Sequence, residues 1–111
     1  GLPVFLLGGG SNLLVSDEGF RGLVIRNACE TLQFEGTAVH AECGADFTDL
    51  IFRCRDHGLA GLEFAAGIPG SVGGALYGNA VRMVHTAPNV RLNGRRAVPL
   101  ATSVCLRPSG P

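Results

Sequence analysis

Charged residues are scarce in this chain, and acidic residues are absent from its last third. Charged side chains make up 16% of the 111 residues, whereas soluble domains usually carry about 25%. No acidic residue follows Glu63, but five arginines do: Arg82, Arg91, Arg95, Arg96 and Arg107. Such a basic stretch can contact nucleic acid, but this one has neither interleaved aromatic residues nor a recognisable motif. We therefore do not expect nucleic acid as a partner.

Closely spaced cysteines and long apolar runs are also lacking. No C-x-x-C pair, the usual spacing of zinc ligands, occurs among Cys29, Cys43, Cys54 and Cys105, and we expect no metal site. No apolar run approaches the ~20 residues that span a bilayer, so no membrane partner is expected. Free buried thiols are typical of a cytoplasmic protein, which is the expected location, while disulfides are the alternative that an even number of cysteines leaves open.

Glycine, in contrast, is abundant. It accounts for 17 of the 111 residues, about twice its usual share of roughly 7%. These glycines follow no collagen period and cluster in loops, which indicates special backbone geometry. Hydrophobic residues make up 46% of the chain, so we expect a folded chain of one domain at most.

Short apolar runs separated by turns dominate the first 45 residues and are typical of β-strands. They predict strands over residues 3–7, 13–15, 22–26, 31–34 and 37–43. The first of these is expected to be a buried strand. In the last, the period of two places Val39, Ala41 and Cys43 on the inward face.

A helical period replaces this pattern over residues 46–57, where the apolar positions are Phe47, Leu50, Ile51 and Cys54. Asp46 is the predicted N-cap, and Gly58 is the predicted left-handed stop. A second, shorter helix is predicted over residues 71–77 with Ser71 as its cap. Several strands followed by an amphipathic helix indicate an α+β fold.

Two glycine-rich loops, residues 8–12 and 67–75, are the candidate binding elements. The first follows a predicted strand, and its backbone amides can converge on a pyrophosphate. It is neither a Walker A loop nor the dinucleotide fingerprint, because no lysine follows it and position 13 is leucine. The second contains four glycines and Pro69, which allow a flat ligand to approach the backbone. Taken alone, the first loop is explained equally well by a tight turn between strands, and the second equally well by close packing of backbone on backbone.

Together, the loops resemble those of one enzyme family. Residues 7–26 (L-G-G-G-S-N-L-L-V-S-D-E-G-F-x-G-L-V-I-R) are similar to the first flavin loop of UDP-N-acetylenolpyruvoylglucosamine reductases. Residues 61–80 (G-L-E-F-A-A-G-I-P-G-S-V-G-G-A-L-Y-x-N-A) resemble the second flavin loop of that family. The order and separation of the two motifs also match.

This resemblance implies a partial FAD-binding domain of the PCMH (vanillyl-alcohol-oxidase) type. The family reduces the enolpyruvyl group of a UDP-sugar, its partner, to form UDP-N-acetylmuramate for peptidoglycan synthesis, with NADPH as the hydride donor to FAD. By resemblance, the residues that contact FAD are Gly8, Gly9, Gly10, Ser11, Asn12, Gly44, Ala45, Gly67, Ile68, Pro69, Gly70, Ser71, Gly73, Gly74, Ala75 and Asn79. Two alternatives stay open, namely the flavin module of another oxidoreductase of the same superfamily and a decayed product without a ligand.

The chain also departs from the family. No residue matches the arginine, serine and glutamate of the family's substrate-binding and catalytic machinery, so no catalytic residue is assigned and the isolated chain is expected to be inactive. The polar side chains His40, His57, Glu63 and Tyr77 are expected to be structural.

After Ala80 the family usually continues Gly-Ala-Tyr-Gly, whereas this chain reads Val81-Arg82-Met83. A single missing base after the Ala80 codon converts codons for the family's residues into codons for these. We therefore predict a partial FAD-binding domain over residues 1–80 and a divergent tail over 81–111. The tail is either frameshifted or an authentic divergence.

Overall fold

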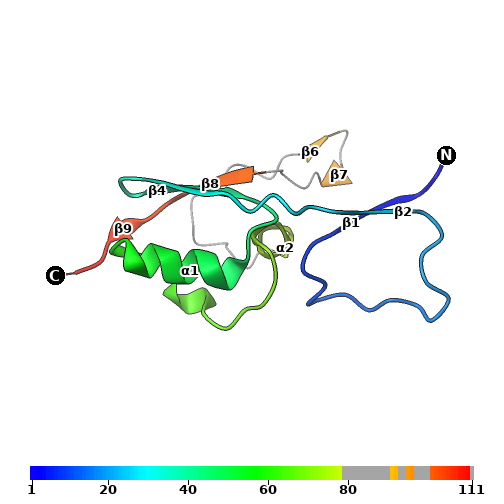
Figure 1. Ribbon diagram of the computed structural model, residues 1–111, viewed down its shortest axis with the longest axis horizontal. Helices are drawn as coiled ribbons and strands as arrows, with labels where there is room; N and C mark the ends of the chain where they lie inside the picture. Colours follow the sequence, from blue (N-terminus) through cyan, green and yellow to red (C-terminus); the bar gives the residue numbers. More distant parts are fainter. Residues whose placement is uncertain (79–90, 93–94, 97–100, 111) are drawn as a thin grey trace.

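The computed structural model describes residues 1–78, 91–92, 95–96 and 101–110. It is elongated, with principal extents of 54 × 29 × 21 Å, and its two termini lie at opposite ends (Figure 1). Strands and helices are mixed, which confirms the predicted α+β class.

An antiparallel sheet and one helix form the packed part of the molecule. The sheet has the order β3-β4-β8, with β3 at Leu32–Glu35, β4 at Ala38–Glu42 and β8 at Ala101–Cys105. Helix α1 (Phe47–Asp56) runs beneath β4 and β8 in Figure 1. The inward residues Val39, Ala41 and Cys43 are buried, which confirms the predicted alternation along β4.

Helix α1 has the residues and boundaries that the sequence predicts. Its apolar positions Phe47, Leu50, Ile51 and Cys54 are all buried. The Asp46 carboxylate accepts a hydrogen bond from the Asp49 amide at 2.8 Å, which satisfies a donor that the first turn leaves free. After the helix, Gly58 has a φ of 68°, the left-handed conformation typical of a helix stop.

Short elements close the other side of the core. Strand β5 (Leu59–Ala60) pairs with β9 (Arg107–Pro108), and η1 (Glu63–Ala65) and α2 (Val72–Tyr77) follow β5. Strands β6 (Arg91–Leu92) and β7 (Arg95–Arg96) pair with each other. The core residues are Leu32, Val39, Ala41, Ala45, Phe47, Leu50, Ile51, Cys54, Leu59, Leu62, Ala65, Val72 and Ala75, with Leu106 packed against them.

The N-terminal end of the molecule has a different construction. Strands β1 (Val4–Leu7) and β2 (Leu23–Arg26) form a parallel pair that lies away from α1 (Figure 1). No side chain in residues 1–31 is buried. The prediction of a strand over residues 3–7 is therefore confirmed, but the prediction that it is buried is wrong, because no described helix or sheet covers it.

The predicted strand over residues 13–15 does not form. These residues lie in the long loop between β1 and β2 and have no ladder partner among the described residues. Leu14 is almost fully exposed. The apolar pattern alone indicated a strand there, but a strand also requires a neighbour with which to pair its backbone groups.

Candidate functional site

Two segments that are distant in the sequence run side by side at the candidate site. The turn after β4 pairs with the second glycine-rich loop through three backbone hydrogen bonds: Phe47 N to Gly70 O at 2.9 Å, Val72 N to Ala45 O at 2.8 Å, and Gly73 N to Cys43 O at 2.9 Å. The segment 43–47 therefore fixes the course of the loop that leads into α2.

The first glycine-rich loop packs directly on the second. A Cβ atom added at Gly9 would lie 3.1 Å from the Cα of Gly70, and one at Gly8 would lie 2.7 Å from the Oγ of Ser71. On the other side of the contact, a Cβ at Gly70 would lie 3.6 Å from the Oγ of Ser11. The two loops thus meet backbone to backbone at Gly9 and Gly70, whereas Gly8 faces the hydroxyl group of Ser71, and the absence of side chains at positions 8 and 9 suits this approach.

Two further glycines are required by packing within the chain itself. A Cβ at Gly44 would lie 2.5 Å from the carbonyl oxygen of Asn27 and 2.8 Å from the amide nitrogen of Cys29. A Cβ at Gly73 would lie 2.9 Å from the Cβ of Cys43. Sequence reasoning missed the crossing of residues 27–29 over Gly44, for which the only signal was the glycine in the turn after β4.

Gly10 and Gly67 differ from Gly8, Gly9, Gly44 and Gly73. Both have a positive φ, 76° and 92°, and an added Cβ would meet no atom within 4 Å at either position. The backbone amides of residues 9–12 donate no hydrogen bond to another described residue. A turn whose amides are uncommitted and whose outer side is open is the kind of concavity that binds anionic groups.

The other predicted contact residues occupy varied environments. Ser11, Asn12, Pro69 and Gly74 are exposed, Ile68 packs partly against the core, and the side chains of Ala45 and Ala75 lie within the core. Ser71 is buried, and its Oγ accepts a hydrogen bond from the Gly74 amide at 3.1 Å, which confirms the predicted cap of α2. Asn79 lies outside the described residues. Contact of these residues with a cofactor stays a prediction.

The cysteine beside the loops is not a nucleophile at neutral pH. Cys43 is a free, buried thiol, and burial raises its pKa to about 11. The pKa of Cys54 is raised to about 11 for the same reason. Because a thiolate and not a thiol reacts, both side chains have a packing role. Within the part of the chain that the structure describes, no group of three histidine, cysteine or acidic side chains is arranged to hold a metal ion.

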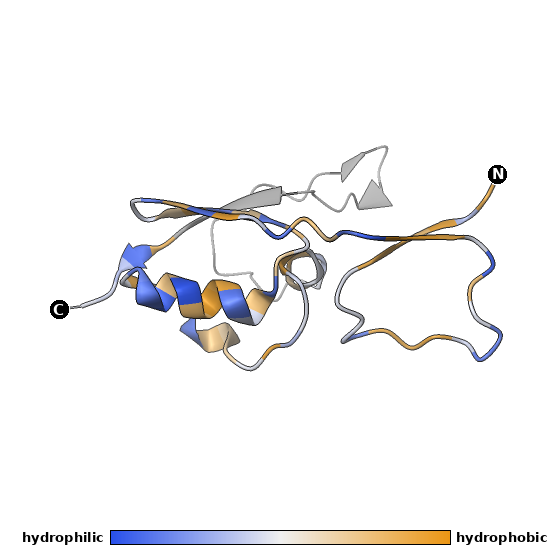
Figure 2. Cartoon of the chain, viewed as in Figure 1, coloured by the Kyte–Doolittle hydropathy of each residue, from blue (hydrophilic) through white to orange (hydrophobic). Residues whose placement is uncertain are grey.

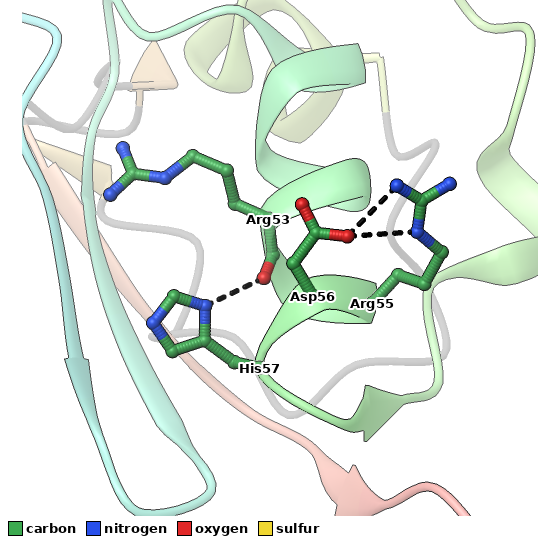
Figure 3. A network of polar contacts seen from close by, with 4 residues as sticks. All are labelled: Arg53, Arg55, Asp56 and His57. Carbon is green, nitrogen blue, oxygen red and sulfur yellow. Dashed lines mark hydrogen bonds and ion pairs between the residues drawn. The ribbon is translucent and has the colours of Figure 1, made fainter.

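Two of the polar side chains expected to be structural stabilise local turns. His57 ends α1, and its Nδ1 lies 2.8 Å from the carbonyl oxygen of Arg53 (Figure 3). The His57 ring stacks on Phe34 of β3, with centroids 3.8 Å apart. Glu63 accepts a hydrogen bond from the Gly61 amide at 2.8 Å. Backbone amides of Glu63 itself and of Gly61 lower the pKa of this carboxyl group.

The other two lie on exposed parts of the chain. His40 lines a hollow of about 340 Å³ on the outer face of β3 and β4, together with Gln33, Glu35 and Ala38. Tyr77 is exposed at the end of α2.

At the C-terminal end of α1, Arg55 and Asp56 form an exposed ion pair at 2.8 Å (Figure 3), which contributes little to stability because water screens it.

The family model for the FAD binding domain matches residues 1–91, which include all three segments of the site. The chain belongs to this family of FAD-binding domains. It is 54% identical over 86 residues to the UDP-N-acetylenolpyruvoylglucosamine reductase of Solibacter usitatus, which covers 78% of this chain and 28% of the relative. The resemblance predicted from the two loop motifs is therefore confirmed.

Two further relatives carry the same name. The enzyme of Limosilactobacillus fermentum is 51% identical over 81 residues, which cover 72% of this chain and 27% of the relative. UDP-N-acetylenolpyruvoylglucosamine reductase 2 of Bacillus anthracis is 50% identical over 80 residues, with 71% and 26% covered. The chain thus spans little more than a quarter of the length of these relatives.

Among the described helices, none has the length and apolar character needed to cross a membrane.

Proposed function

We propose that this chain is the FAD-binding part of an oxidoreductase and that its three apposed segments hold the cofactor. The observation that carries the proposal is the open, positive-φ turn at Gly10, which lies on the loop that packs against Gly70 and Ser71. A side chain at position 10 would project into the space on the outer side of this turn. The exposed hydroxyl and amide of Ser11 and Asn12 add further polar groups at the same place.

The residues present suit the pyrophosphate of FAD. Backbone amides of residues 9–12 are hydrogen-bond donors without a described acceptor, and a pyrophosphate offers several anionic oxygen acceptors. Gly67 leaves the second loop similarly open, so the adjoining parts of the cofactor can lie along the backbone. The other contacts that we propose come from the remaining residues of these two loops, from Gly44 and Ala45 in the turn after β4, and from Asn79.

The reaction we propose for the whole protein is the conversion of UDP-N-acetylenolpyruvoylglucosamine to UDP-N-acetylmuramate with NADPH, in cytoplasmic peptidoglycan synthesis. Three relatives with 50–54% identity bear the name of this reductase, which supports the proposal. When bound, FAD supplies the hydride-transfer chemistry. The chain itself supplies cofactor binding and no assigned catalytic residue, so we expect it to bind FAD and to be inactive alone.

We further propose that the fold is the PCMH type, with a partial domain over residues 1–80 and a divergent tail over 81–111. The relatives align with 80, 81 and 86 residues of the chain, which is close to the length of the proposed partial domain, whereas the family model extends to residue 91. Sequencing the gene across the Ala80 codon tests the frameshift. An uninterrupted, well-supported reading frame would show that the tail is an authentic divergence.

Flavin binding tests the site through two matched glycine variants. Gly10 and Gly19 have nearly the same φ, 76° and 74°, and an added Cβ meets nothing within 4 Å at either position. Gly10→Ala and Gly19→Ala therefore impose the same backbone strain. We expect Gly10→Ala to weaken FAD binding about tenfold or more, a loss of at least ~1.4 kcal/mol, and Gly19→Ala to leave it unchanged. Titration of FAD fluorescence measures both, and equal affinities or no FAD uptake by the unchanged chain would contradict the site.

A chimera tests the reaction separately from the site. Residues 1–78 of this chain replace the matching segment of the Solibacter usitatus relative, and NADPH oxidation is followed with UDP-N-acetylenolpyruvoylglucosamine. Substrate-dependent oxidation supports the reductase function. A chimera that binds FAD but does not oxidise NADPH with this substrate would instead favour another oxidoreductase of the same superfamily.

A further inference from the structure

The first glycine-rich loop and the connection from β2 to the sheet leave the strand pair β1–β2 at the same end. The two strands are parallel, and the register pairs Leu7, the last residue of β1, with Arg26, the last residue of β2. Gly8 therefore starts the loop beside the point where Asn27 starts the connection to β3. We call residues 27–31 the crossing segment, and Figure 2 shows that the chain changes from hydrophobic to hydrophilic where β2 ends and this segment begins. The position of the crossing segment thus also determines the position of the first loop.

Glu42, at the end of β4, holds the far end of the crossing segment. The Glu42 amide donates a hydrogen bond to the carbonyl oxygen of Thr31 at 3.0 Å, and Glu42 Oε2 accepts one from the Thr31 amide at 2.8 Å. In an antiparallel ladder, a hydrogen-bonded pair of residues exchanges both bonds through backbone groups. Here a side-chain oxygen replaces one of the two carbonyl oxygens, so the Glu42 carboxylate completes a pair at the end of the ladder.

The carbonyl oxygen that the carboxylate replaces has a different role. It accepts a hydrogen bond from the Ala45 amide at 3.0 Å, which closes the turn around Gly44. The carbonyl oxygen of Ala45 accepts a hydrogen bond in turn from the Val72 amide of the second glycine-rich loop, at 2.8 Å. Glu42 thus holds the crossing segment with its side chain and, with its backbone, shapes the turn that pairs with the second loop.

The bond between the carboxylate and the Thr31 amide is charge-assisted at neutral pH. The Thr31 amide lowers the pKa of the Glu42 carboxyl group below its ordinary value of 4.5, and His40 on the same strand lowers this pKa further to a smaller extent. A hydrogen bond to a charged acceptor is stronger than one between neutral groups. The carboxylate is therefore a better acceptor for the Thr31 amide than the carbonyl oxygen it replaces.

We propose that Glu42 is a positioning residue that sets the separation of the two glycine-rich loops and thereby the affinity of the chain for FAD. The proposal rests on the cofactor site proposed above, to which it adds a residue outside both loops. Glu42 acts on the first loop through the crossing segment and on the second through the turn at Gly44. Without the carboxylate, the amides of Thr31 and Ala45 compete for one carbonyl oxygen, and either the crossing segment or the turn is held less firmly. A cofactor that contacts both loops then binds to a site whose halves are not fixed relative to each other.

Glu63 provides a matched control for substitutions of Glu42. Both carboxylates accept a hydrogen bond from a backbone amide at 2.8 Å, but the bond of Glu63 reaches only to Gly61, two residues away. We expect Glu42→Ala to weaken FAD binding about tenfold, and Glu42→Gln, whose amide oxygen still accepts the bond, to bind within about threefold of the unchanged chain. Glu63→Ala should leave the affinity unchanged. Titration of FAD fluorescence measures all three, and circular dichroism checks that each variant is folded.

Three results of this titration would overturn the proposal. The first is an equal affinity of Glu42→Ala and the unchanged chain. The second is a loss in Glu63→Ala as large as that in Glu42→Ala, which would mean that any lost carboxylate bond weakens the site. The third is a Glu42→Gln variant that binds as weakly as Glu42→Ala, because an acceptor at this position would then not restore the site.

Amide hydrogen exchange tests the positioning role without FAD. We expect the amides of Thr31 and Ala45 to exchange about tenfold faster in Glu42→Ala than in the unchanged chain, and at unchanged rates in Glu63→Ala. Unchanged exchange at both amides in Glu42→Ala would overturn the positioning role whether or not FAD binds. Absence of FAD uptake by the unchanged chain would instead contradict the cofactor site itself, so the two failures are distinguishable.

Discussion

Residues 1–31 and residues 32–78 are both rich in apolar side chains, but they bury them to different extents. Phe5 on β1 is 36% exposed, whereas Phe47 on α1 is 1% exposed. The second region has a helix that covers its sheet, and the first has two strands and a long loop. The difference teaches that a local apolar pattern selects the element, whereas its burial depends on a partner elsewhere in the chain.

The candidate site lies where the two regions meet. Gly8 and Gly9 of the first region pack on Gly70 and Ser71 of the second, and residues 27–29 cross over Gly44. The Glu42 amide donates a hydrogen bond to the carbonyl oxygen of Thr31 at 3.0 Å, which is a third connection between the two regions. The geometry of the proposed cofactor site therefore depends on the contacts that hold residues 1–31, which bury no side chain, against residues 32–78, which form most of the core.

Substitution of the two phenylalanines should give the largest contrast in stability. We expect Phe47→Ala to lower the free energy of unfolding by about 3–5 kcal/mol, because it leaves a cavity in the core. Phe5→Ala should cost about 1 kcal/mol or less, since part of the ring is already in water. Urea unfolding followed by circular dichroism measures both values. A Phe5→Ala cost equal to that of Phe47→Ala would mean that β1 is packed as tightly as α1.

Alanine at Gly44 should have the next largest effect, because it separates the two regions. Its Cβ would lie within 2.8 Å of the backbone at Asn27 and Cys29, and we expect a loss of about 2–3 kcal/mol from overpacking. Gly78→Ala is the control, since the Cβ there would make only ordinary contacts, the nearest at 3.5 Å, and its φ of −77° suits any residue. Thermal unfolding compares the two variants, and equal melting temperatures would show that the crossing is not tight.

The serines of the two loops should differ by a smaller amount. Ser71 caps α2 through its bond with the Gly74 amide, and Ser71→Ala should cost about 1 kcal/mol. Ser11 is exposed on the first loop, so Ser11→Ala should change stability by less than about 0.5 kcal/mol. The same unfolding assay measures both, and a larger cost at Ser11 would reverse the assignment of the capping serine.

The smallest expected effect concerns pH. The Thr31 amide donates a hydrogen bond to Glu42 Oε2 at 2.8 Å, and this bond lowers the pKa of the Glu42 carboxyl group below its ordinary value of 4.5. Because the pKa is lowered in the folded state, this hydrogen bond contributes fully to the free energy of unfolding above about pH 4.5. The contribution is lost as the pH falls through the pKa of Glu42 in the folded state. Glu42→Gln should therefore flatten this part of the stability curve, which urea unfolding at a series of pH values measures. The same curve for Glu42→Gln and the unchanged chain would show that the carboxylate does not tie the two regions together.

The sequence predicted those parts of the fold that depend on local signals. Asp46, the helical spacing from Phe47 to Cys54, and Gly58 define α1 almost completely, because a cap, an apolar stripe and a stop act within a few residues. The strand over residues 13–15 was wrongly predicted because only a distant ladder partner can complete a strand. The exposure of β1 was missed for the same reason.

The candidate site was predictable in composition but not in arrangement. Both loops were identified from their glycines and from the resemblance they carry. Their direct contact joins Gly9 to Gly70, which are far apart in the sequence, and no local pattern encodes such a contact. The sequence left turn, packing and ligand contact as equal explanations of the glycines. The structure shows close packing at Gly9, Gly44 and Gly73 and open turns with a positive φ at Gly10 and Gly67, and contact of these two turns with a ligand stays a prediction.

The contact between Gly9 and Gly70 also restricts how this site can evolve. A clash between two side chains is often relieved when the second residue becomes smaller, and compensatory mutations arise in this way. Here both positions already carry the smallest residue, so a side chain gained at position 9 has no smaller replacement available at position 70. A side chain at position 9 is therefore accommodated only by a shift of a few tenths of an ångström in the backbone of the second loop, and not by a smaller residue at position 70.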